Sequence, residues 1–244
     1  MSSGSSSLRR SPAKAVAALA AAALVSLGQP PASNATPAAQ PRLVPAAGYL
    51  VWPKVAARTR PEEKAPVVGV LSEFDGQYRP RVVLALQARV GSNGRPTWYR
   101  ISLPGRPNGR TGWVPAYTLD VKPVRRSITI DRSARVLTLR EGERLLLRTR
   151  VAVGAPGMET PLGTFYATRK FRPTAPILGA FAMETSAYSK LSEWPGGGIV
   201  GIHGTNQPWL LGQAVSHGCI RVANDQILKL ARLTSLGTPI RIVP

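Results

Sequence analysis

Short apolar runs separated by turns rich in Gly and Pro are the feature that most limits the folds open to this chain. The 244 residues include 23 Gly and 23 Pro, and charged residues make up only 18% of the total. Apolar runs of strand length bounded by such turns favour β-strands over a helical bundle. Hydrophobic residues make up 43%, which is enough to build a core. We therefore expect a mainly β protein.

The first group of expected strands covers residues 49–121. Its members are Val67–Leu71, Arg81–Ala88, Thr97–Leu103 and Gly112–Tyr117. About five short strands in a segment of this length predict a small barrel. The Gly112-Trp113-Val114 end and the Arg58-Thr59-Arg60-Pro61 loop resemble those of bacterial SH3-like domains. The resemblance implies a module that binds wall peptides or one that only orients the rest of the chain.

The second group covers residues 126–244. Its expected strands are Ser127–Asp131, Arg135–Leu139, Leu145–Val153, Thr164–Thr168, Ile199–Ile202 and Ile240–Val243, with an irregular stretch over Arg172–Gly198. One helix is expected near the C-terminus, capped by Asn224 or Asp225 and stopped by Gly237. Its apolar face would consist of Ile227, Leu228, Ala231 and Leu233. This segment is therefore expected to be a β-barrel or sandwich with one helix packed on it.

The N-terminus has the layout of a secretory signal peptide. A basic stretch at residues 9–14 precedes the apolar run Ala15–Leu27, and small residues follow at 33–35. The alternative is a retained membrane anchor, for which the apolar run is short. We expect a signal peptide over residues 1–35, a Pro/Ala-rich linker over 36–48, and an exported protein that touches the membrane only if the signal is not cleaved.

The net charge is strongly positive. The chain carries 32 Lys and Arg against 12 Asp and Glu, a formal charge of +20. A charge of this size favours polyanions such as nucleic acid, anionic lipid or an acidic cell wall. The basic residues are spread along the chain, with no signature of a nucleic-acid-binding module, so nucleic acid is not an expected partner. Attraction to the wall and a merely solvated basic surface both remain open.

The chemistry-bearing residues gather in one short segment. The only cysteine and both histidines, His203, His217 and Cys219, lie within seventeen residues, and each stands beside Gly. With one cysteine an intramolecular disulfide is excluded. A Cys–His pair can perform acyl transfer, because imidazole activates the thiol and carries its proton. Neighbouring Gly residues let backbone N–H groups turn toward a developing oxyanion. Spacing alone leaves open which histidine is the base.

These residues resemble the L,D-transpeptidase catalytic (YkuD-type) family. The chain has His203-Gly204-Thr205 followed by Ser216-His217-Gly218-Cys219, and the Thr160–Phe165 turn and the layout of Ser127–Val243 also match. The resemblance implies that Cys219 is the nucleophile and His203 the base. It also implies that the N–H groups of Gly218 and Cys219 form the oxyanion hole, and that the Gly204 carbonyl orients the His203 ring. No Asp or Glu lies between His203 and Asp225, which fits that last role.

The resemblance further implies that Ser216, His217 and Arg221 line the substrate site. Arg221 would receive a substrate carboxylate, but many family members carry Asn there, and a surface charge at a strand end is the alternative. The aromatic residues Tyr188, Trp194 and Trp209 belong either to a substrate groove or to ordinary packing. No metal or cofactor is expected.

By this resemblance the expected function is L,D-transpeptidation in a bacterial cell wall or periplasm. Cys219 would form a thioester with a peptidoglycan stem peptide and pass it to an amine, in wall cross-linking or remodelling. Carbapenem-type inhibitors are expected to acylate the same thiol. Three alternatives remain: an L,D-carboxypeptidase that uses water as acceptor, a zinc site built from the two His and the Cys, and a non-catalytic wall-binding protein.

Overall fold

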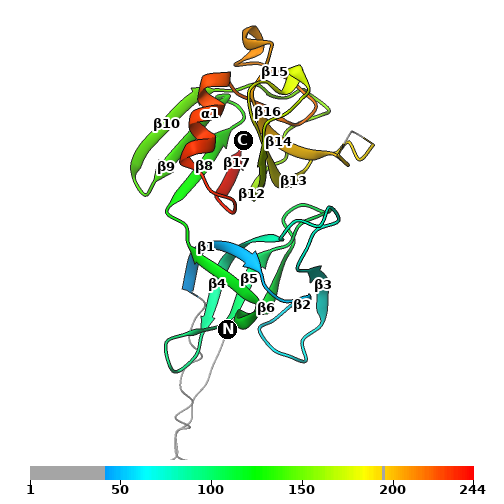
Figure 1. Cartoon of the computed structure of the whole chain (residues 1–244), viewed down its shortest axis with the longest axis vertical. Helices are drawn as coiled ribbons and strands as arrows, with labels where there is room; N and C mark the ends of the chain where they lie inside the picture. Colours follow the sequence, from blue (N-terminus) through cyan, green and yellow to red (C-terminus); the bar gives the residue numbers. More distant parts are fainter. Residues whose placement is uncertain (1–41, 194–195) are drawn as a thin grey trace, which may run out of the picture. The chain divides into compact units, whose positions relative to one another are not determined.

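The computed structural model describes residues 42–193 and 196–244. The expected signal peptide, and the expected linker up to residue 41, lie outside the described residues. Within them, seventeen strands and one α-helix are found, together with three 3-10 turns, η1 (Ala116–Thr118), η2 (Pro176–Leu178) and η3 (Pro208–Leu210). The expectation of a mainly β protein with one C-terminal helix is confirmed (Figure 1).

The N-terminal strands form one seven-stranded antiparallel sheet with the order β3-β2-β6-β5-β4-β1-β7. Its strands are β1 (Arg42–Leu50), β2 (Lys54–Arg58), β3 (Val67–Ser72), β4 (Val82–Val90), β5 (Pro96–Ser102), β6 (Thr111–Pro115) and β7 (Leu119–Pro123). Val83, Ile101 and Val114 lie fully buried in the core of this sheet. The resemblance to SH3-like domains stays a prediction.

β1 begins inside the segment expected to be linker. Residues 42–48 are strand rather than linker, because β1 pairs with both β4 and β7. Ala46 and Leu50 of β1 are 3% and 1% exposed and belong to the core. The sequence did not predict this strand, because its Ala and Pro residues show little of the alternation between apolar and polar residues that indicates a β-strand.

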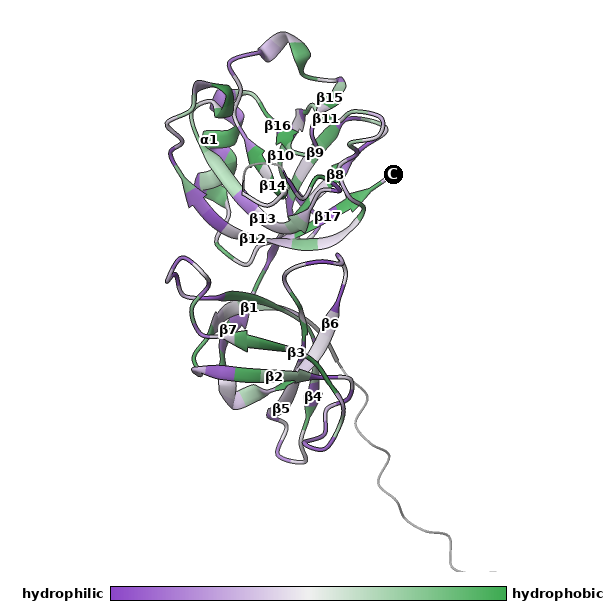
Figure 2. Ribbon diagram, turned by 90° about the vertical axis from the view of Figure 1, so that its right-hand side faces the viewer, coloured by the Kyte–Doolittle hydropathy of each residue, from purple (hydrophilic) through white to green (hydrophobic). Residues whose placement is uncertain are grey.

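The second sheet has eight strands in the order β10-β9-β8-β17-β12-β13-β14-β16. They are β8 (Arg126–Asp131), β9 (Val136–Glu141), β10 (Arg144–Arg150), β12 (Gly163–Phe171), β13 (Ala182–Tyr188), β14 (Ile199–His203), β16 (Ile220–Arg221) and β17 (Pro239–Val243). β11 (Val153–Gly154) and β15 (Ala214–Ser216) form a separate parallel pair. Figure 2 shows hydrophobic stretches along the strands and hydrophilic ones in most turns between them.

β13 lies in the stretch that was expected to be irregular. The strand pairs with β12 on one side and β14 on the other, and Met183 and Ala187 are fully buried. Two further buried groups of the strand are polar: Thr185 donates a hydrogen bond to the Val200 carbonyl (2.7 Å), and Ser186 accepts one from the Tyr166 N–H (3.2 Å). A strand built from small and hydroxyl residues gives a weak sequence signal, although these contacts stabilise it.

The helix α1 (Asn224–Leu233) lies where it was expected, but its details differ. The N-cap is Ala223 and no side chain caps the helix, so the cap prediction is wrong. The helix ends at Leu233 instead of being stopped by Gly237. Its fully buried residues are Ile227 and Leu230, whereas Leu228 and Ala231 are only partly buried.

Lys170 on β12 fastens the C-terminal end of α1 to the sheet. Its ammonium donates hydrogen bonds to the carbonyls of Ala231 (2.7 Å) and Thr234. A positive charge at this end of a helix is favourable, since the last carbonyls have no partner within the helix. Burial lowers the pKa of Lys170 from its usual value.

Replacing Lys170 by Met keeps most of the aliphatic chain and removes these bonds. Because hydrogen bonds to a charged group are stronger than neutral ones, Lys170→Met is expected to lower the free energy of unfolding by about 2 kcal/mol. Urea unfolding at neutral pH measures this change. Lys229→Met is the matched control, since Lys229 is exposed on the same helix. Equal stability of the two variants would contradict the role of Lys170.

Candidate active site

The parallel pairing of β14 with β16 brings the expected nucleophile and base together. Ile202 pairs with Ile220 and His203 with Arg221 (Figure 1). Ile202 and Ile220 are fully buried in the core. Because side chains along a strand alternate between faces, His203, Cys219 and Arg221 lie together on the opposite face.

His203 is held by the carbonyl of the next residue. The ring is 5% exposed, and its Nδ1 lies 2.6 Å from the oxygen of Gly204. A carbonyl oxygen can only accept a hydrogen bond, so Nδ1 carries the proton. In the neutral ring Nε2 then has the lone pair and is the basic nitrogen.

Burial keeps this ring uncharged. It lowers the pKa of His203 to about 4, with the positive charge of Arg221 acting in the same direction and the bond to Gly204 opposing it. At neutral pH the imidazole is therefore a free base that can accept a proton.

Cys219 directly precedes β16 and is partly exposed. Its Sγ accepts a hydrogen bond from the Gly201 N–H at 3.4 Å. Burial raises the pKa of the Cys219 thiol, and the Gly201 bond and the charge of Arg221 only partly offset that effect. The pKa shifts of Cys219 and His203 both favour the neutral forms, so the resting site holds a thiol and an imidazole rather than an ion pair.

Ser216 shapes the turn that carries Cys219. Its hydroxyl donates a hydrogen bond to the Cys219 carbonyl (2.5 Å) and accepts one from the Gly218 N–H (3.2 Å). Ser216 is 1% exposed, so its hydroxyl orders the turn from inside. The same bond occupies the Gly218 N–H, one of the two expected oxyanion donors.

Gly218 occupies a place that no other residue fits. Its φ is +109°, and a Cβ there would lie 2.9 Å from the Cβ of Ser189. Its carbonyl accepts a hydrogen bond from the Thr160 hydroxyl (2.9 Å), which itself accepts one from the Gly154 N–H (2.9 Å). Thr160 is fully buried, and sequence reasoning missed this role, although the turn that begins at Thr160 was recognised.

Arg221 and His217 flank the site. Arg221 is partly buried and donates a hydrogen bond to the Gln207 side chain (3.0 Å). Its positive charge acts to lower the pKa values of both His203 and Cys219. His217 is partly exposed between Ser216 and Gly218.

The aromatic residues named from the sequence have different surroundings. The Tyr188 ring lies 4.8 Å from the Arg106 guanidinium, a cation–π contact. Trp209 on η3 is 68% exposed. Trp194 lies outside the described residues.

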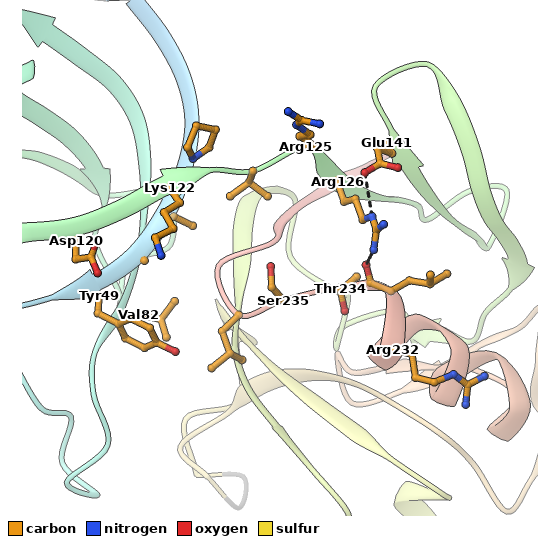
Figure 3. A pocket seen from close by; sticks show the side chains of 16 residues that line it. Tyr49, Val82, Asp120, Lys122, Arg125, Arg126, Glu141, Arg232, Thr234 and Ser235 are labelled. Atoms are coloured by element: carbon orange, nitrogen blue, oxygen red, sulfur yellow. Dashed lines mark hydrogen bonds and ion pairs between the residues drawn. The ribbon is translucent and has the colours of Figure 1, made fainter. Parts of the chain in front are cut away.

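Two cavities of the described residues are lined by neither His203 nor Cys219. One of about 740 Å³ is lined by Thr160, which bonds to the Gly218 carbonyl, and by Tyr188 and Ser189. The cavity of Figure 3, about 650 Å³, contains none of the predicted site residues. There Arg126 donates a hydrogen bond to the Leu233 carbonyl (2.6 Å) and pairs with Glu141 (3.4 Å).

Two further features are absent from the described residues. No helix among them is long and apolar enough to cross a membrane. In the same part of the chain, no three His, Cys, Asp or Glu side chains are grouped so that they could hold a metal ion.

Comparison with known proteins shows the family to which the sequence belongs. The model of the L,D-transpeptidase catalytic domain, YkuD, matches residues 125–242. YkuD of Bacillus licheniformis, described as an L,D-transpeptidase, is 33% identical over 177 residues, covering 71% of this chain and 93% of its own length. YkuD of Bacillus subtilis is 30% identical over 173 residues, covering 70% and 92%. The chain belongs to the YkuD family of L,D-transpeptidases.

A solved L,D-transpeptidase in complex with imipenem is also similar to this chain. It is 18% identical, covers 67% of this chain and 91% of its own, and superimposes with a TM-score of 0.42.

The lowered pKa of His203 predicts a pH dependence of stability. Unfolded His titrates near 6.5 and folded His203 near 4, so between these values the unfolded state binds more protons. Stability is therefore lost as the pH falls from 6.5 to 4, by up to about 3 kcal/mol from this residue. Urea unfolding at several pH values tests this, with His203→Gln as the reference. If both proteins lose stability equally over that range, the shift is absent.

Proposed function

We propose that this protein is a peptidoglycan L,D-transpeptidase in which Cys219 is the nucleophile and His203 the general base. The observation that carries the proposal is the hydrogen bond from His203 Nδ1 to the Gly204 carbonyl, which leaves Nε2 basic on the face that Cys219 shares. Membership of the YkuD family supports transpeptidation in general.

The first half of the reaction is acylation. Nε2 of His203 takes the thiol proton as Sγ of Cys219 attacks the carbonyl carbon of the third stem residue. The tetrahedral intermediate then collapses, the bond to the terminal D-amino acid breaks, and Nε2 returns the proton to the leaving amine. The product is a thioester on Cys219. A site that rests as thiol and imidazole needs this proton transfer during the attack.

The second half is aminolysis. An amine of a neighbouring stem attacks the thioester, a new amide bond forms, and the proton of the amine passes through His203 back to Sγ. With water as the acceptor the same acyl-enzyme would give a trimmed peptide, which is the carboxypeptidase alternative. A non-catalytic wall-binding protein would have no need of the ordered Ser216–Cys219 turn.

The oxyanion is assigned to backbone N–H groups at the turn. The Cys219 N–H is the principal donor, because the Gly218 N–H already donates to Ser216 Oγ at 3.2 Å. That bond is long for a hydroxyl acceptor, so the Gly218 N–H can shift toward an oxyanion as negative charge develops. Arg221, held by Gln207, supplies a positive charge for a substrate carboxylate.

The proposal also covers partners and location. The substrates are peptidoglycan stem peptides outside the membrane, reached by export through the N-terminal signal. The strained lactam carbonyl of a carbapenem suits the same thiol, so carbapenem-type inhibitors are expected acyl donors. The formal charge of +20 suits a protein held among anionic wall polymers.

Incubation of the protein with a disaccharide-tetrapeptide, followed by mass spectrometry of protein and products, tests the proposal. Wild type is expected to carry an acyl group on Cys219 and to form a cross-linked dimer, whereas Cys219→Ala forms neither. His203→Gln is expected to acylate about a thousandfold more slowly, since general-base catalysis is worth that order.

His217→Gln is the matched control, because it removes the other histidine and leaves the base intact. A thousandfold loss in His217→Gln with little loss in His203→Gln would reverse the assignment of the base. A trimmed peptide as the only product would favour the carboxypeptidase. No adduct on a reduced Cys219 would reject the acyl-transfer mechanism.

A further inference from the structure

Asn224, which was expected to cap the helix, makes a different set of contacts. Its Oδ1 accepts hydrogen bonds from the N–H groups of Ala180 (2.9 Å) and Thr205 (3.1 Å). Its Nδ2 donates a hydrogen bond to the Thr205 carbonyl (3.0 Å). One side-chain amide thus joins the start of α1 to the turn after His203 and to the segment after η2.

The close approach of Asn224 to the neighbouring backbone leaves no room for a side chain at two glycines. A Cβ at Gly179 or at Gly204 would lie 2.2 Å from Asn224 Oδ1. Gly204 is further held by its own N–H, which donates to the Phe181 carbonyl (2.9 Å). The requirement for Gly at position 204 therefore follows from close packing on Asn224.

The contact with Thr205 acts on the peptide group that holds the histidine. The N–H of Thr205 and the carbonyl of Gly204 belong to one peptide unit, which is planar. The N–H donates to Asn224 and the carbonyl accepts from His203 Nδ1 at 2.6 Å. Fixing the direction of the N–H fixes the direction of the carbonyl, and successive hydrogen bonds of this kind strengthen one another.

We propose that Asn224 is a positioning residue which, through the Gly204–Thr205 peptide, holds His203 as the Nδ1–H tautomer with Nε2 turned to Cys219. The inference rests on the proposed function, in which Nε2 is the base. Asn224 takes the place that a carboxylate has in Ser-His-Asp triads, with a peptide group between. The Asn224 amide and the Gly204–Thr205 peptide, which together form this relay, are both uncharged. They orient the His203 ring without stabilising its protonated form as a carboxylate would, in keeping with the neutral ring.

The test reads the tautomer directly. The chain has two histidines, so ¹⁵N NMR of the imidazoles at pH 7 is simple to assign with His217→Gln. Wild-type His203 is expected to be protonated at Nδ1 alone. In Asn224→Ala the ring is expected to become a mixture of both tautomers, and the maximal rate of Cys219 acylation to fall about tenfold with KM changed less than twofold.

Two variants separate positioning from simple support of the helix. Asp225→Ala removes the acidic residue next to Asn224 in the first turn of α1, and it is expected to keep both the tautomer and the rate. Asn224→Asp keeps an oxygen that accepts from Ala180 and Thr205, so it is expected to keep the Nδ1–H tautomer and a rate between those of wild type and Asn224→Ala. If Asn224→Ala does not fold, Asn224→Asp still tests whether Asn224 positions the His203 ring.

The outcomes separate the inference from the proposed function. An unchanged His203 tautomer in folded Asn224→Ala overturns the inference, as does an equal loss of rate in Asp225→Ala. A wild type that forms no acyl-enzyme overturns the proposed function, and the NMR result still decides what Asn224 does to the ring. Loss of the Nδ1–H tautomer in Asn224→Asp would also count against the relay.

Discussion

Two residue pairs join β14 to β16 in parallel: Ile202 with Ile220, and His203 with Arg221. Arg221 is also bridged to Ala152 by two backbone hydrogen bonds (3.0 and 2.9 Å), so this short strand is fixed on both sides. The two buried isoleucines set which face is core, and that choice places His203 and Cys219 on the other face. A slip of one residue would turn Cys219 toward the core and Ile220 away from it, so the position of Cys219 depends on core packing.

At rest, neither His203 nor Cys219 is charged. Burial disfavours both the imidazolium and the thiolate. A neutral pair costs less to bury than an ion pair that lacks full hydrogen bonding. Hydrogen bonds instead fix the orientation of the site's groups. The Gly204 carbonyl sets the tautomer of His203, the Ser216 hydroxyl closes the turn before Cys219, and the Thr160 hydroxyl holds the Gly218 carbonyl. Each of these contacts involves the backbone, which explains why small residues surround the cysteine.

The sequence predicted the mainly β architecture, the helix and the cluster of His203, His217 and Cys219. It could do so because strand alternation, helix length and a Cys–His–Gly pattern are local signals. It did not predict β13, whose small and hydroxyl residues become a strand only between two neighbours. Nor could it separate the roles within the cluster. Asn224 bonds to backbone groups that lie 19 and 44 residues away along the chain and are brought near by the fold, and no spacing in the sequence encodes such contacts.

The pKa shifts of Cys219 and His203 mean that the site rests as a thiol beside a neutral imidazole. The rate at which iodoacetamide alkylates Cys219, measured from pH 4 to pH 11, tests this resting state, because only the thiolate reacts. The rate is expected to be slow at neutral pH and to rise only above the ordinary thiol pKa of about 8.5. A fast plateau that begins below pH 6 and is lost in His203→Gln would instead show a thiolate–imidazolium pair at rest.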